Sequence, residues 1–97
     1  MKKLSAIIAL TFLATTAHAD TFNIKSYCRE VADAVGGSYQ IEESCRKIEK
    51  ESKNKLSRRK VPARIRSYCY EVAKAVGGSY QILESCIDME LEAKGRL

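Results

Sequence analysis

Apolar side chains between positions 24 and 35 recur at the spacing of one face of an α-helix. They fall at i, i+3, i+4, i+7, i+8 and i+11 and are Ile24, Tyr27, Cys28, Val31, Ala32 and Val35. A stripe of this kind is typical of an amphipathic helix. Three further apolar residues at i, i+4 and i+7, Ile41, Cys45 and Ile48, predict a second helix.

A Gly-Gly-Ser segment separates the two apolar stripes. Gly36 and Gly37 suit the end of the first helix, because glycine adopts the left-handed conformation of a helix C-cap. Ser38 suits the N-cap of the second helix, since its hydroxyl can accept a free backbone N–H. The pattern therefore predicts a helical hairpin with its corner at residues 36–38.

The same pattern occurs twice. Residues 24–49 and 65–90 align without a gap at an offset of 41, and 19 of the 26 paired positions are identical. The sequence predicts an all-α protein of two tandem hairpins, over residues 20–52 and 62–97. Residues 53–61 are predicted to form a basic linker, with its flexible part from Asn54 to Val61, and Pro62 suits the first turn of the third helix.

The segment from position 1 to position 19 has the features of an export signal. Lys2 and Lys3 precede a mostly apolar run over positions 4–13, and Ala17-His18-Ala19 has the small-x-small pattern of a cleavage site. The run is shorter than the roughly 20 residues that span a bilayer. A buried amphipathic helix is the alternative, but the run lacks a polar face. We expect cleavage after Ala19 and a periplasmic or secreted protein.

Four cysteines follow the predicted signal, and an even number in an exported chain predicts two disulfides. The two cysteines of each copy are equally distant from its Gly-Gly corner, so antiparallel helices bring them to one level. Zinc is the weaker alternative, because zinc-binding cysteines usually occur in close pairs. Cross-linking between the copies is a further alternative. We predict the pairs Cys28–Cys45 and Cys69–Cys86.

Seven basic residues and no acidic residue occupy positions 53–66. Such a cluster can contact an anionic envelope component or an acidic protein. The alternative is a solvated connector. Nucleic acid is a poor candidate partner, because no stacking aromatic residues interleave the cluster. The residues are Lys53, Lys55, Arg58, Arg59, Lys60, Arg64 and Arg66.

The two copies differ most on their second helices. Glu42 and Arg46 of the first copy correspond to Leu83 and Ile87 of the second, and Leu91 extends this second apolar stripe. The last helix therefore has more apolar surface than one hairpin can bury. We expect it to pack on the first hairpin as a small four-helix arrangement; a homodimer through Leu83, Ile87 and Leu91 is the alternative.

Candidate sites are few. Tyr27 and Tyr68 lie on the apolar stripes and are expected in the core. Tyrosine is favoured at interfaces, so the residues after each corner are candidate contacts. They are Tyr39, Gln40, Tyr80 and Gln81. The predicted mature chain has no histidine, and no nucleophile with an adjacent base, metal-ligand cluster or phosphate-binding loop is recognisable, so we expect neither catalysis nor a cofactor.

The segments Ser26–Ile41 and Ser67–Ile82 share the pattern Ser-Tyr-Cys-x-Glu-Val-Ala-x-Ala-Val-Gly-Gly-Ser-Tyr-Gln-Ile. This pattern resembles small exported proteins of Gram-negative bacteria that carry one or two such units, a group whose resemblance implies no particular activity. The sequence favours a non-catalytic extracytoplasmic interaction module. A secreted inhibitor of another protein and a structural envelope component are the alternatives.

Overall fold

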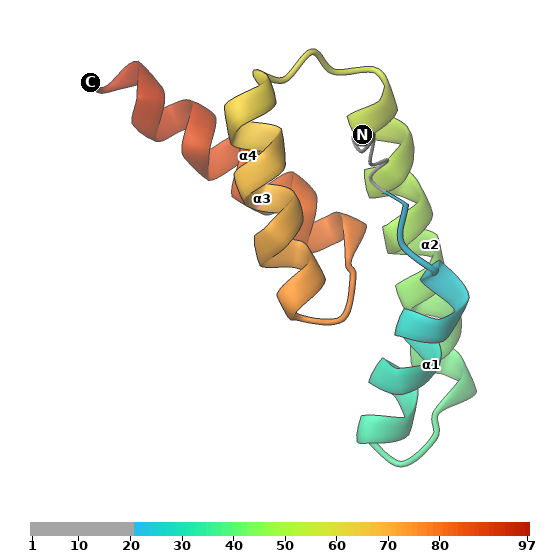
Figure 1. Ribbon diagram of the computed structural model, residues 1–97. Coiled ribbons are helices and arrows are strands. Elements are labelled where there is room, and N and C mark those ends of the chain that lie inside the picture. The colour runs from blue at the N-terminus through green and yellow to red at the C-terminus, as the bar shows by residue number, and fades with distance from the viewer. Residues whose placement is uncertain (1–20) are drawn as a thin grey trace, which may run out of the picture.

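A computed structural model describes residues 21–97, and within this range the chain is all-helical. The predicted signal peptide lies outside the described residues. Two antiparallel hairpins follow one another, and the second lies beside the upper half of the first (Figure 1). The helices are α1 (Ile24–Ala34), α2 (Tyr39–Ser57), α3 (Ala63–Ala75) and α4 (Tyr80–Gly95).

Both corners are built as the sequence predicts. Gly36 and Gly37 have φ of 98° and 87°, in the left-handed region that favours glycine. The Gly37 N–H donates to the Ala32 carbonyl (2.7 Å) and the Gly36 N–H to the Asp33 carbonyl (3.1 Å). This pair of bonds is a Schellman motif. Ser38 Oγ then accepts the N–H of Ile41 and starts α2. The second corner repeats this geometry at residues 77–79.

Each hairpin is closed by its own disulfide, as predicted. Cys28 pairs with Cys45 and Cys69 with Cys86, and the Cα atoms of both pairs are 5.5 Å apart. None of these four cysteines is free. The disulfides fit an oxidising extracytoplasmic compartment. In the part of the chain described, no helix combines the length and apolarity needed to cross a membrane.

Helix α2 is longer than predicted. It continues to Ser57, so residues 53–57 are helical and the linker spans only residues 58–62. The prediction of a flexible segment from Asn54 was wrong at its start. No proline or glycine interrupts the chain between Ser38 and Pro62, and either residue would be costly inside a helix. The buried Ser52 and Leu56 also give the added turns a face to pack.

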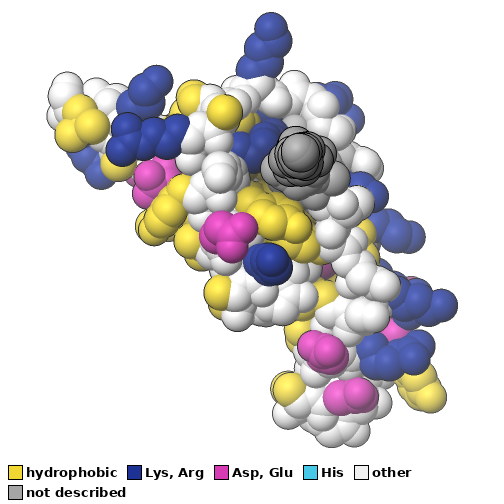
Figure 2. Space-filling view, in the orientation of Figure 1, with side chains coloured by type: hydrophobic (Ala, Val, Ile, Leu, Met, Phe, Trp, Pro, Cys, Tyr) yellow, Lys and Arg dark blue, Asp and Glu magenta, His cyan; other side chains and the backbone are white. Residues whose placement is uncertain are grey.

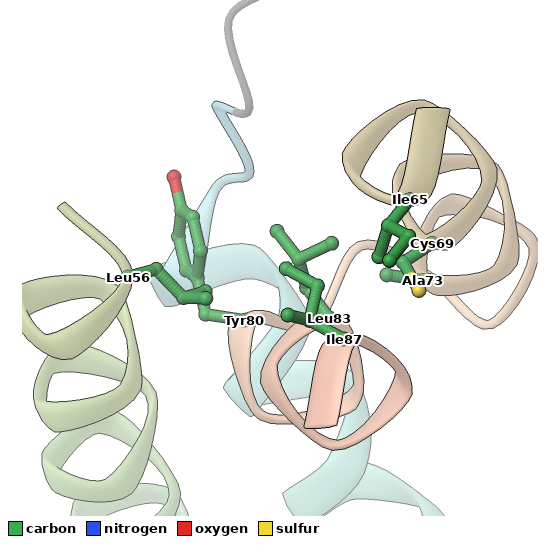
Figure 3. Close-up of a cluster of buried hydrophobic side chains, with 7 residues drawn as sticks. All are labelled: Leu56, Ile65, Cys69, Ala73, Tyr80, Leu83 and Ile87. Atoms are coloured by element: carbon green, nitrogen blue, oxygen red, sulfur yellow. The ribbon is translucent and has the colours of Figure 1, made fainter. Parts of the chain in front are cut away.

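The hairpins pack together through α2 and α4. Leu83 and Ile87 are fully buried in one apolar cluster with Leu56 of α2 and with residues of α3 (Figure 3). The predicted packing of the last helix on the first hairpin is therefore confirmed. Leu83 and Ile87 are not available for the alternative homodimer, because the chain's own helices cover them.

The two stripe tyrosines differ from the prediction. Tyr27 is only half-buried, and Tyr68 is 56 % exposed. The core expected around Tyr68 does not form, since no other part of the described chain covers that end of the second hairpin. The ring of Tyr68 is therefore exposed beside the C-terminal end of α4.

Candidate functional site

A buried carboxylate joins the two hairpins. Glu49, on α2, is only 1 % exposed, and its side chain reaches the first residues of α4. Its carboxylate accepts hydrogen bonds from Ser79 Oγ (2.7 Å), from the Tyr80 N–H (2.6 Å) and, at 3.4 Å, from the Gln81 N–H. The negative charge therefore lies at a helix N-terminus, where free N–H groups and the helix dipole stabilise it.

The ring of Tyr80 is buried in the same contact. It packs against Phe22, with ring centroids 5.1 Å apart, and its hydroxyl accepts the Phe22 N–H at 2.9 Å. The ammonium group of Lys53 lies 5.6 Å from the ring centroid. This separation is within the range of a cation–π interaction. Tyr80 is thus held from three sides: by the segment before α1, by α2 and by the core.

The second corner is covered by the first hairpin as well. A Cβ placed on Gly78 would lie 3.0 Å from Cδ1 of Phe22, and one placed on Gly77 would lie 3.4 Å from Tyr27. We call residues 77–81 the second tip. We call the surface that receives it the first socket, formed by Phe22, Tyr27, Glu49, Lys53 and Leu56.

The corresponding first tip, residues 36–40, is uncovered. Tyr39 is 88 % exposed, Gln40 is exposed, and no atom lies within 4 Å of a Cβ placed on Gly36 or Gly37. The prediction of an exposed tyrosine at each tip is right for Tyr39 and wrong for Tyr80. Two identical Ser-Tyr-Gln segments therefore have opposite environments, because the chain contains a partner surface for only one of them.

An open hollow of about 570 Å³ lies at the far end of the second hairpin. Its position matches that of the first socket, because four of its eight lining residues are the repeat counterparts of first-socket residues. We call it the second socket and define it by Tyr68, Glu90, Lys94 and Leu97. Tyr68 and Leu97 are exposed, and the Glu90 side chain makes no hydrogen bond or ion pair with the described residues. No part of residues 21–97 fills this hollow.

The basic residues predicted as a contact surface divide into two groups. Lys53 lies on the Tyr80 ring, Arg59 forms an ion pair with Asp88 (2.8 Å), and Arg66 is half-buried near Leu83. These three contribute to the packing of the hairpins. The others are exposed and form no ion pair within residues 21–97. They are Lys55, Arg58, Lys60 and Arg64.

Figure 2 shows the distribution of these charges on one face. Lys and Arg side chains project along the α2 edge of the molecule and from the linker above it. Lys55 belongs to the last turn of α2, and Arg58 and Lys60 follow in the linker. Because α2 is longer than predicted, its rigid end supports part of this basic surface.

In the described range no group of three His, Cys, Asp or Glu side chains is arranged to hold a metal ion. The sequence interpretation missed Glu49, which it did not single out as a candidate residue. A signal was present, because the repeat includes Glu49 and Glu90 and continues beyond these two residues. At the same offset of 41, the later identical pairs are Glu51 and Glu92, Lys53 and Lys94, and Leu56 and Leu97.

Comparison with protein-family models, curated proteins and solved structures finds no match to this chain.

Proposed function

We propose that the protein is a non-catalytic extracytoplasmic binding module that contacts anionic envelope material through the end of α2 and the linker. The observation that carries the proposal is the set of exposed basic residues gathered there, which form no ion pair within residues 21–97. Lys55, Arg58 and Lys60 lie within six positions of one another, with no acidic residue between them. Their positive charge is therefore available to a partner.

Within residues 21–97 no acidic side chain forms an ion pair with Lys55, Arg58 or Lys60, and the nearest acidic residue in the sequence is the exposed Glu51, one turn before Lys55. Asp88 pairs with Arg59, and Glu49 is buried against α4. Glu42 pairs with Arg46 at the opposite end of α2. The linker and the end of α2 therefore carry an excess of basic residues, and such an excess favours phosphate- or carboxylate-bearing surfaces.

General electrostatics gives the expected contribution of these basic residues to the binding free energy. Near an anionic lipid surface each Lys or Arg contributes about 1 kcal/mol. Replacing Lys55, Arg58 and Lys60 by glutamine should then weaken binding by about 3 kcal/mol, or roughly two orders of magnitude. Salt should weaken the wild-type interaction strongly, because exposed charges are screened within about 10 Å at 0.1 M.

The test is binding of the oxidised protein to vesicles of phosphatidylglycerol and phosphatidylethanolamine, with phosphatidylcholine vesicles as the neutral reference. The matched control replaces three exposed lysines elsewhere, Lys25, Lys50 and Lys74, by glutamine, and changes the net charge equally. We expect the linker variant to lose far more affinity than the control. Equal losses, or binding to anionic vesicles that salt does not weaken, would reject the proposal.

A further inference from the structure

We propose that copies of this protein associate head to tail, with the first tip of one copy seated in the second socket of the next. Each chain already contains one such contact, in which the first socket holds the second tip. The tip and socket that remain exposed are the duplicates of those two surfaces. The proposal does not depend on anion binding, because Lys55, Arg58 and Lys60 lie in neither surface.

The duplication supplies both halves of the contact. The repeat that relates the hairpins places Glu90 where the first hairpin has Glu49, and it places Leu97 where that hairpin has Leu56. On the other side, the segment from Ser38 to Gln40 is identical to the segment from Ser79 to Gln81, which meets Glu49. The carboxylate and the helix start that bond to each other inside the chain therefore both occur again on its surface.

The internal contact predicts the bonds of the external one. Glu90 would accept hydrogen bonds from Ser38 Oγ and from the Tyr39 N–H of the next copy, as Glu49 accepts them from Ser79 and Tyr80. The Tyr39 ring would enter the hollow beside Tyr68. This would bury a tyrosine that is now 88 % exposed.

One difference between the copies also fits this arrangement. Leu83 lines a small hollow together with Lys53 and Leu56. Its counterpart on the first hairpin is Glu42, and the counterpart of Lys53 is Lys94. Glu42, which pairs with Arg46 within its own chain, would thus face a lysine across the contact between copies, where the internal contact has a leucine.

The external contact should be weaker than the internal one. The repeat counterpart of Phe22 is Ala63, which does not line the second socket, and Arg46 stands on the first hairpin where the second has Ile87. The aromatic ring and part of the apolar core are therefore missing. The internal contact also has the advantage of being within one chain. We expect reversible association that increases with protein concentration.

The geometry predicts an open chain of copies. The tip and the socket are different surfaces at opposite ends of the molecule, so the contact is heterologous and leaves one free tip and one free socket after every addition. A symmetric dimer, in contrast, would use one surface twice and would stop at two copies.

Two one-sided variants test this directly by analytical ultracentrifugation. Tyr39→Ala damages only the tip, and Glu90→Lys damages only the socket. Each variant alone should remain monomeric at concentrations where the wild type forms a series of oligomers. An equimolar mixture should recover dimers but nothing larger, because one intact tip meets one intact socket.

The mixture also shows that both variants are folded, since a misfolded variant could not restore the contact. Glu71→Lys, the same charge change at an exposed position of α3 outside both surfaces, should associate like the wild type. The proposal is overturned if the wild type stays monomeric at about 1 mM, where contacts of about 4 kcal/mol would be seen. It is also overturned if the mixture stays monomeric or if Glu71→Lys abolishes association.

Discussion

Replacing Glu49 by alanine should destabilise the protein far more than the same change at its counterpart, Glu90. Glu49 is buried and accepts two short hydrogen bonds, from Ser79 and Tyr80. A hydrogen bond to a charged group contributes about 1.5–3 kcal/mol. Taking the lower value for each, and neglecting the 3.4 Å contact with Gln81, the loss is about 3 kcal/mol.

The assay is urea unfolding of the oxidised protein, followed by far-ultraviolet circular dichroism at low micromolar concentration. With a slope of about 1 kcal/mol per M, as expected for a small protein, a loss of about 3 kcal/mol lowers the midpoint by about 3 M. Hydrogen exchange at the Tyr80 amide adds a local measurement, because that N–H loses its acceptor. Glu49→Gln keeps the shape and one acceptor oxygen and should lose only about 1–2 kcal/mol.

Glu90→Ala is the matched control. The Glu90 side chain has no hydrogen bond or ion pair with the described residues. Its replacement should therefore change the unfolding free energy by no more than about 0.5 kcal/mol. If Glu49→Ala shifts the midpoint by less than about 0.5 M, or if the two variants behave alike, the carboxylate does not hold the hairpins together.

Two further predictions concern the corners and the disulfides. Gly78→Ala and Gly37→Ala place a side chain at the same φ of 87°, but only the Cβ at position 78 would meet Phe22, at 3.0 Å. Both variants should lose about 1–2 kcal/mol of stability to backbone strain. Thermal unfolding should show a larger loss for Gly78→Ala, and the difference measures the contact between the hairpins. Equal losses would contradict that contact. Reduction should lower the free energy of unfolding by about 3 kcal/mol for each disulfide, so we expect the protein to unfold when a reductant is added. An unchanged melting temperature would show that the helices do not need the disulfides.

The local features of this fold could be predicted from the sequence because they depend on neighbouring residues. The corner at Gly36 and Gly37, the cap at Ser38 and the pairing of Cys28 with Cys45 follow from helical spacing and turn chemistry. The end of α2 was misplaced because charged residues such as Lys55 suggest a linker, although they also form helix well.

The site could be predicted only in part, because its decisive contacts join distant segments. Tyr39 and Tyr80 occupy identical sequence contexts, and only the three-dimensional arrangement makes one exposed and the other buried. Glutamate is rarely buried unless paired, so nothing local to Glu49 indicated its environment. The leucine at position 83 did indicate that α4 is covered, but not which residues of α2 cover it.

Both sulfur cross-links close within a single repeat, and neither passes from one repeat to the other. Each repeat can therefore form its own disulfide before the other repeat has folded, because both of its cysteines lie within that repeat. The same independence would allow the protein to gain further repeats by duplication. A third unit, joined by another short connector, would add its own covalent staple and would need no change in the existing ones.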